Sequence, residues 1–240
     1  MRAYLDRLFR LARNEVGLVI GLLLTASLLL GFGNLAAEVL EGDTGAFDRA
    51  ILLLFRDQGE LTVPIGPAWL QEMARDVTAL GSFALLGFLT LGTFGYLLIV
   101  QKQHAAWFLM ASVLGGTALS TILKLLFERA RPEFFPEATH VFTASFPSGH
   151  SLISALVYLT IASLLMRIHP DRTVRVYIVA TAVFLTIIVG VSRIYLGVHW
   201  PTDVLAGWCL GSAWAIFCWS LVLRLQKDGA VEKPATSPVV

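Results

Sequence analysis

Six long apolar runs constrain the fold of this 240-residue chain more than any other feature of its sequence. A run of about 20 apolar residues crosses a bilayer as one α-helix, because a helix satisfies its own backbone hydrogen bonds where water is absent. Only 15% of the residues are charged, whereas a soluble domain carries roughly 25%. We therefore predict an all-α, polytopic membrane protein with six transmembrane helices. The predicted spans are 16–37, 80–100, 105–127, 151–166, 174–191 and 203–223.

The basic residues predict how these helices are oriented. Lysine and arginine gather in the cytoplasmic loops of membrane proteins. If the six spans alternate in direction, 11 of the 18 basic residues lie on the side that holds both termini. We predict that this side is cytoplasmic. The other seven would lie outside, against the insertion bias, and they need a functional reason: Arg49, Arg56, Arg75, Lys124, Arg129, Arg131 and Arg193.

The spans predict a single transmembrane domain, 1–227, followed by a polar tail, 228–240, which we expect to be disordered and cytoplasmic. The first span reads as an anchor or as a signal segment, and its length favours an anchor. The longest stretch between spans, 41–76, contains an apolar run flanked by charges, 47–56. This pattern predicts an amphipathic helix, either at the outer membrane interface or packed on the bundle.

A polar tetrapeptide, Pro147-Ser148-Gly149-His150, precedes the fourth span. Ser148 is a favoured helix N-cap, and the free N–H groups of a first helical turn form an anion site. His150 would add a group that gives or takes a proton near neutral pH. Alone, the same four residues also fit a serine-capped helix with a histidine of no special role.

Other polar residues gather at the same predicted ends of the spans. Lys124, Arg131 and Arg193 provide three cations, and arginine and lysine both bind phosphate oxygens. Together with Ser148 and the backbone of Gly149, they predict a pocket for a tetrahedral dianion. No set of carboxylates has magnesium-site spacing, so we expect neither a metal nor another cofactor.

His199 and Asp203 are four residues apart, so they share one face if this segment is helical. The carboxylate would then orient the imidazole and leave its second nitrogen free to attack. His150 would protonate the leaving oxygen and later activate water. Singly, each group also fits a structural role: a cap pair for His199 and Asp203, a headgroup anchor for Arg193, and snorkelling for Lys124.

The chain resembles the type-2 phosphatidic acid phosphatase superfamily, integral-membrane lipid phosphate phosphatases that share their active-site motifs with vanadium haloperoxidases. The motifs that carry the resemblance are Lys124-x6-Arg131-Pro132, Pro147-Ser148-Gly149-His150 and Ser192-Arg193-x5-His199-x3-Asp203. The resemblance implies that His199 forms a phosphohistidine, that Asp203 orients it, and that His150 is the general acid and then the base. It also implies phosphoryl binding by Lys124, Arg131, Ser148, Gly149 and Arg193, without a metal.

We therefore expect a lipid phosphatase in a bacterial-type inner membrane, with its site on the extracytoplasmic side. Phosphatidate, phosphatidylglycerophosphate and polyprenyl pyrophosphate all fit as substrates, and 41–76 and 133–146 would select the headgroup. A phosphotransferase, a vanadate-dependent oxidase and a non-catalytic lipid-binding or transport protein are the alternatives. We expect membrane lipids as partners and, at a net charge of +1, no nucleic acid. The sequence carries no signal for an oligomeric state.

Overall fold

The computed structural model describes residues 2–132 and 144–227. These residues form helices and no strand beyond one isolated bridge, between Arg56 and Pro64. The predicted tail, 228–240, and residues 133–143 of the 133–146 loop lie outside the described part. The helices are α1 (Arg2–Glu41), α2 (Gly45–Leu53), α3 (Ala68–Ala79), α4 (Phe83–Ile99), α5 (Gln103–Phe127), α6 (Gly149–Ile168), α7 (Arg172–Tyr195) and α8 (Pro201–Lys227).

Five of these helices, α1, α5, α6, α7 and α8, are long and apolar enough to cross a membrane. The short helices α3 and α4 pass the same test only together, and they meet at a bend of 42°. After the bend, Ser82 caps the start of α4, and its side chain accepts a hydrogen bond from Leu85 N (3.2 Å). The predicted all-α membrane fold is confirmed, with five spans, or six if this bent pair counts as one span. The orientation of the termini stays a prediction.

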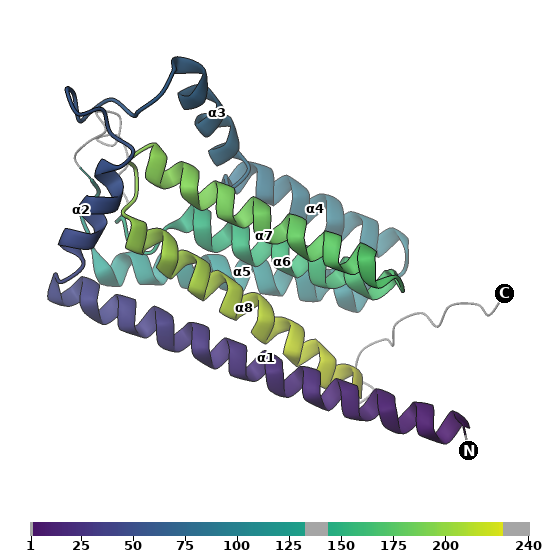
Figure 1. The fold of residues 1–240 in the computed structure, drawn as a ribbon. Coiled ribbons are helices and arrows are strands. Elements are labelled where there is room, and N and C mark those ends of the chain that lie inside the picture. The colour runs from purple at the N-terminus through teal and green to yellow at the C-terminus, as the bar shows by residue number, and fades with distance from the viewer. Residues whose placement is uncertain (1, 133–143, 228–240) are drawn as a thin grey trace.

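Helix α6 lies at the centre of the bundle and packs against α8 and α7 (Figure 1). Two glycines of α8, Gly207 and Gly211, face it one turn apart. A Cβ on Gly207 would lie 2.8 Å from Ser148 O, so only glycine permits this approach. The close crossing brings the first turns of α6 and α8 side by side, and Ser148 N donates to Asp203 O (3.0 Å).

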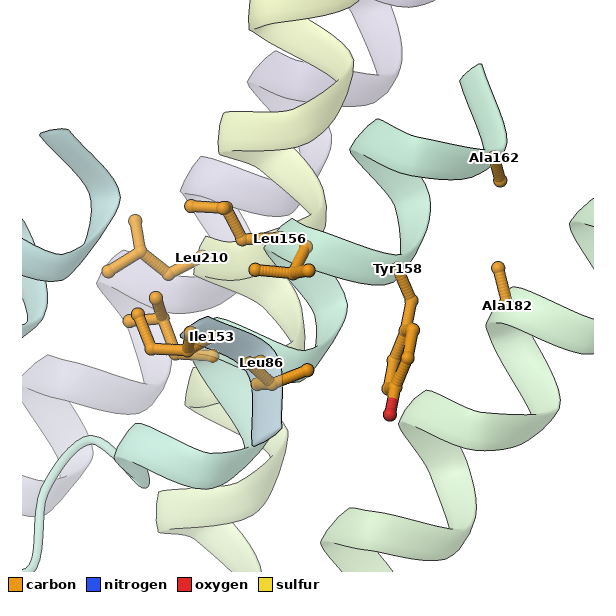
Figure 2. Packing of buried hydrophobic residues seen from close by; sticks show 9 residues of the cluster. Leu86, Ile153, Leu156, Tyr158, Ala162, Ala182 and Leu210 are labelled. Atoms are coloured by element: carbon orange, nitrogen blue, oxygen red, sulfur yellow. The ribbon is translucent and has the colours of Figure 1, made fainter. Parts of the chain in front are cut away.

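Buried apolar side chains hold α6 against its neighbours (Figure 2). Leu86 of α4, Leu156 of α6, Ala182 of α7 and Leu210 of α8 belong to one cluster. Tyr158 of the same cluster donates its hydroxyl to Leu80 O (2.8 Å), at the bend between α3 and α4. The cluster therefore joins the start of α4 to the middle parts of α6, α7 and α8.

Helix α2 shows how the predicted amphipathic segment is used. It is shorter than predicted, and its buried residues are Asp48 and Leu52, whereas Phe47 is 51% exposed. It contacts α8 at the end of the bundle opposite to the N-terminus (Figure 1). Of the two interpretations of this segment, packing on the bundle is the one that its contacts support.

Candidate active site

The predicted site residues come from five segments that meet at one end of the bundle. Lys124 lies in the last turn of α5, and Arg131 lies in the loop that follows it. Arg193 lies in the last turn of α7. The starts of α6 and α8 face each other here. Ser148 caps α6, Gly149 and His150 lie in its first turn, His199 lies in the turn just before α8, and Asp203 lies in the first turn of α8.

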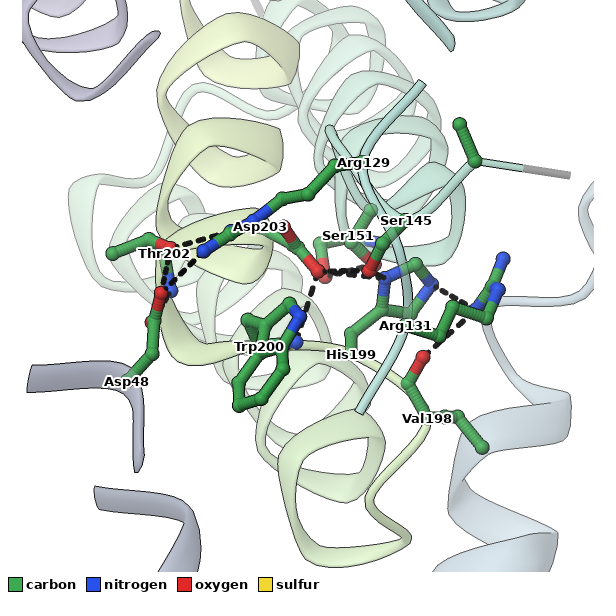
Figure 3. A network of polar contacts seen from close by, with 12 residues as sticks. Asp48, Arg129, Arg131, Ser145, Ser151, Val198, His199, Trp200, Thr202 and Asp203 are labelled. Carbon is green, nitrogen blue, oxygen red and sulfur yellow. Dashed lines mark hydrogen bonds and ion pairs between the residues drawn. The ribbon is translucent and has the colours of Figure 1, made fainter. Parts of the chain in front are cut away.

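His199 is the centre of a hydrogen-bonded arrangement (Figure 3). Its side chain is 2% exposed, and its Nδ1 lies 3.3 Å from Asp203 Oδ2. Its Nε2 lies 3.2 Å from Arg131 Nη1, which also donates to Val198 O (2.7 Å). A carboxylate at Nδ1 places the proton there, which leaves a lone pair on Nε2. The nitrogen that carries the lone pair therefore faces the Arg131 guanidinium.

The surroundings of His199 keep its imidazole neutral. Burial and the charges of Arg193, Arg131 and Lys124 hold the pKa of His199 well below the ordinary histidine value of 6.5. Removal from water and nearby cations both disfavour the protonated form. At neutral pH the ring is therefore unprotonated at Nε2 and able to attack an electrophilic phosphorus.

The three predicted cations surround the two histidines. Lys124, Arg131 and Arg193 all lie within electrostatic range of both His150 and His199. Lys124 Nζ donates to Ala144 O (3.2 Å). Arg193 Nη1 donates to Thr78 Oγ1 of α3 (3.2 Å). The Nε atom of Arg193 is buried and has no hydrogen-bond partner in the described part of the chain. Such a cluster has unused capacity to bind an anion.

The start of α6 supplies the remaining predicted groups. Ser148 caps the helix as expected, and its Oγ accepts from Ser151 N (3.5 Å) and Ser151 Oγ (3.0 Å). His150 is half-buried beside Gly81 of the α3–α4 bend, where a Cβ would lie 3.4 Å from His150 Cδ2. No hydrogen bond to the His150 ring occurs among the described residues, so the ring is available to a ligand.

Sequence reasoning missed the residues that hold Asp203. Arg129 Nη1 lies 2.6 Å from Asp203 Oδ1, and its Nη2 lies 2.6 Å from Asp48 Oδ2. Ser145 donates its hydroxyl to Asp203 Oδ2, and Trp200 N donates to the same oxygen (2.9 Å). The available signals were the excess of basic residues on the predicted outer side and one acidic residue, Asp48, within an apolar helix. Neither signal identifies a partner.

No group of three His, Cys, Asp or Glu side chains is arranged to hold a metal ion within residues 2–132 and 144–227. The carboxylate at His199, that of Asp203, is engaged by Arg129, which also binds Asp48. The charges closest to the two histidines are those of Lys124, Arg131 and Arg193, and this arrangement suits an anionic group.

Comparison with known proteins identifies the family. The sequence model of the PAP2 superfamily matches residues 105–227, a range that contains all three motifs. The chain belongs to the PAP2 superfamily. The predicted family and its enzyme class, lipid phosphatase, are thereby confirmed.

Individual PAP2 members extend the likeness beyond the matched range. Phosphatidylglycerophosphatase B of Bacillus subtilis (strain 168) is 36% identical over 193 residues, which are 77% of this chain and 88% of that protein. A lipid A 1-phosphatase of Rhizobium etli is 28% identical over 200 residues, 69% of this chain and 82% of that protein. The crystal structure of a transmembrane PAP2 type phosphatidylglycerolphosphate phosphatase from Bacillus subtilis superposes with a TM-score of 0.71. It is 30% identical and covers 87% of this chain and 98% of its own.

Proposed function

We propose that this PAP2 protein hydrolyses a lipid phosphate or pyrophosphate without a metal, through a phosphohistidine on His199. The observation that carries the proposal is the buried neutral imidazole of His199, which Asp203 orients and whose Nε2 faces Arg131. A nucleophile and a phosphate-binding fork therefore meet at one point. The family membership supports the reaction class, and the geometry supports the roles of the residues.

The first half-reaction follows from this geometry. Lys124, Arg131 and Arg193 bind the phosphoryl oxygens and stabilise their charge in the transition state. Ser148 and the backbone N–H groups at the start of α6 add neutral donors. Nε2 of His199 then forms a bond to phosphorus while the bond from phosphorus to the lipid oxygen breaks. The bound phosphoryl dianion offsets the charge of these cations, so His150 can hold the proton that it gives to that departing oxygen.

The second half-reaction returns the enzyme to its starting state. His150, now without its proton, takes one from a water molecule, and the water oxygen attacks the phosphohistidine. The bond from phosphorus to Nε2 breaks and inorganic phosphate leaves. Throughout, the Asp203 carboxylate offsets the positive charge that the His199 ring carries while it is phosphorylated.

The substrate is a phosphorylated membrane lipid, and the reaction occurs at the extracytoplasmic face of a bacterial-type inner membrane. The two curated relatives are each named as phosphatases of a lipid phosphate, which supports this substrate class. The predicted distribution of basic residues supports the side. The site lies at the bundle end that carries α2, opposite to the N-terminus (Figure 1).

A phosphate-release assay with purified protein in detergent micelles tests the proposal. Phosphatidate, phosphatidylglycerophosphate and a polyprenyl pyrophosphate are offered separately. His199→Ala should abolish release from every lipid that the wild type hydrolyses. His104→Ala is the matched control, because His104 is exposed at the first turn of α5, at the other end of the bundle. Full activity of His199→Ala would end the proposal.

Labelled substrate separates hydrolysis from the alternatives. Label recovered as free phosphate supports a phosphatase, whereas label transferred to a second lipid would identify a phosphotransferase. A labelled phosphoenzyme that is lost in His199→Ala would exclude a non-catalytic lipid-binding role.

A further inference from the structure

Arg129 joins two buried carboxylates that come from distant parts of the chain (Figure 3). The side chains of Asp48 and Asp203 are 0% exposed, and that of Arg129 is 16% exposed. Arg129 Nη2 lies 2.6 Å from Asp48 Oδ2, and Arg129 Nη1 lies 2.6 Å from Asp203 Oδ1. A continuous row of polar contacts therefore runs from α2, through Arg129 and Asp203, to Nδ1 of His199.

Asp48 is held by more than this ion pair. Thr202 N donates to its Oδ1 (2.9 Å), and Thr202 Oγ1 donates to its Oδ2 (2.7 Å). Arg129 also donates to Thr202 Oγ1 (2.8 Å). Thr202 directly precedes Asp203 in the chain. Asp48 therefore contacts the backbone next to Asp203, and it also contacts Arg129, which binds the Asp203 side chain.

These contacts decide which oxygen of Asp203 faces the histidine. Arg129 occupies Oδ1, and Oδ2 receives Trp200 N and Ser145 Oγ and lies 3.3 Å from His199 Nδ1. A carboxylate that is clamped on one oxygen cannot rotate away from the ring. The direction of the attacking Nε2 therefore depends on a contact that begins on α2.

The charges of the row also match the reaction. Two carboxylates and one guanidinium leave one net negative charge, and it lies next to the ring that becomes cationic on phosphorylation. If the Asp48 charge were removed, Arg129 would draw more of the Asp203 charge away from His199. The row therefore tunes how strongly Asp203 stabilises the phosphorylated ring.

Stability alone is a poor reason for this arrangement. Replacing a buried ion pair by well-packed apolar residues is often neutral or stabilising. Only two residues of α2 are buried, Asp48 and Leu52, and one of them is charged although an apolar residue could hold the helix equally well. If Asp48 helps to fix the position of the Asp203 side chain, this role explains why a charged residue, rather than an apolar one, occupies position 48 of α2.

We propose that Asp48 and Arg129 are positioning residues for the His199–Asp203 pair, so that helix α2 takes part in catalysis. This inference rests on the proposed function, because it needs His199 to be the nucleophile. Asp48→Asn keeps an acceptor for Thr202 N but removes the charge opposite Arg129. Arg129→Lys keeps the charge but removes the fork that binds two carboxylates at once.

Each variant should lower kcat by about tenfold to a hundredfold, the usual effect of a misplaced catalytic group. The lipid KM should change by less than about threefold, because neither residue reaches the phosphate pocket. Asp57→Asn and Arg75→Lys are the matched controls. Both residues are exposed in the same 41–76 segment, and Asp57 accepts only from the local turn, at Gly59 N and Glu60 N. The controls should match the wild type.

A double-mutant cycle with Asp203→Asn separates positioning from a structural role. If Asp48 acts through Asp203, Asp48→Asn should lower kcat by less than about twofold when Asp203 is already asparagine. A fold defect would instead multiply the two losses, and that result would overturn the inference. The same cycle with Arg129→Lys decides the matter if Asp48→Asn cannot be purified as a folded protein.

The outcomes distinguish this inference from the proposed function. Absence of phosphate release by the wild type, or full release by His199→Ala, would refute the proposed function. An active wild type, an inactive His199→Ala and an unchanged kcat for folded Asp48→Asn and Arg129→Lys would overturn the positioning role alone.

Discussion

Replacing Asp203 by asparagine tests the electrostatic core of the site. All four groups that contact its carboxylate are donors: Arg129, Trp200 N, Ser145 Oγ and His199 Nδ1. The amide NH2 of an asparagine must therefore face a donor in either orientation. The less costly orientation turns the NH2 towards Arg129 and keeps the amide oxygen towards His199. The ring would keep its direction and tautomer but lose the neighbouring negative charge.

The size of the effect follows from the distance. Asp203 Oδ2 lies 3.3 Å from His199 Nδ1. At this separation and an effective dielectric constant of about 20, two unit charges attract by about 5 kcal/mol. If the His199 ring carries between half and one full positive charge in the transition state, the Asp203 charge stabilises that state by about 2.5 to 5 kcal/mol. Asp203→Asn should then lower kcat by about 70-fold to about 5,000-fold.

Phosphate release at saturating lipid, with purified protein in detergent micelles, measures this loss. Asp171→Asn is the matched control, because Asp171 caps α7 at the other end of the bundle and asparagine caps a helix equally well. It should match the wild type. A folded Asp203→Asn that loses less than tenfold in kcat would refute the claim that the carboxylate charge acts on His199.

Three further predictions concern protons, metals and packing. The pKa of His199 lies below the ordinary histidine value of 6.5, so the loss of kcat/KM on acidification should occur below pH 6.5. The titration of the substrate phosphate is subtracted before this comparison. A loss centred at or above pH 6.5 would contradict a neutral nucleophile. Excess EDTA should leave phosphate release within about twofold, and a loss that Mg²⁺ restores would reveal a metal step. Gly207→Ala should destabilise the protein by about 1–3 kcal/mol, measured as thermal inactivation, because its Cβ would overlap the backbone at Ser148. Gly87→Ala, which meets no atom within 4 Å, should have little effect.

Local patterns explain why much of the site was predictable. His199 and Asp203 are four residues apart, which indicated that they meet, although His199 lies in the turn before α8 begins at Pro201 and only Asp203 is helical. Ser148 precedes an apolar run, which is the usual place of an N-cap. Alternating spans also predict that the ends of α5 and α7 meet the starts of α6 and α8. The resemblance of the motifs to a known family implies a role for each of these residues.

Other features depend on contacts between distant residues. The apolar run at 80–100 does not reveal that its helix begins at Phe83 and bends against α3, because the bend is held by Tyr158 of another helix. The charge pattern of 47–56 fits an interface helix as well as a packed one. Only the contact of Asp48 with Thr202 and Arg129 distinguishes the two.

By itself, the sequence determined the class of protein, an all-α membrane protein of the PAP2 superfamily, and the set of candidate site residues, because hydropathy and motif spacing can be read along the chain. The tertiary structure decided how the nucleophile is held. Arg129 and Asp48 are 81 positions apart, and neither belongs to a periodic pattern that could indicate the other. A buried charge needs a partner, but which partner it finds depends on how the helices pack.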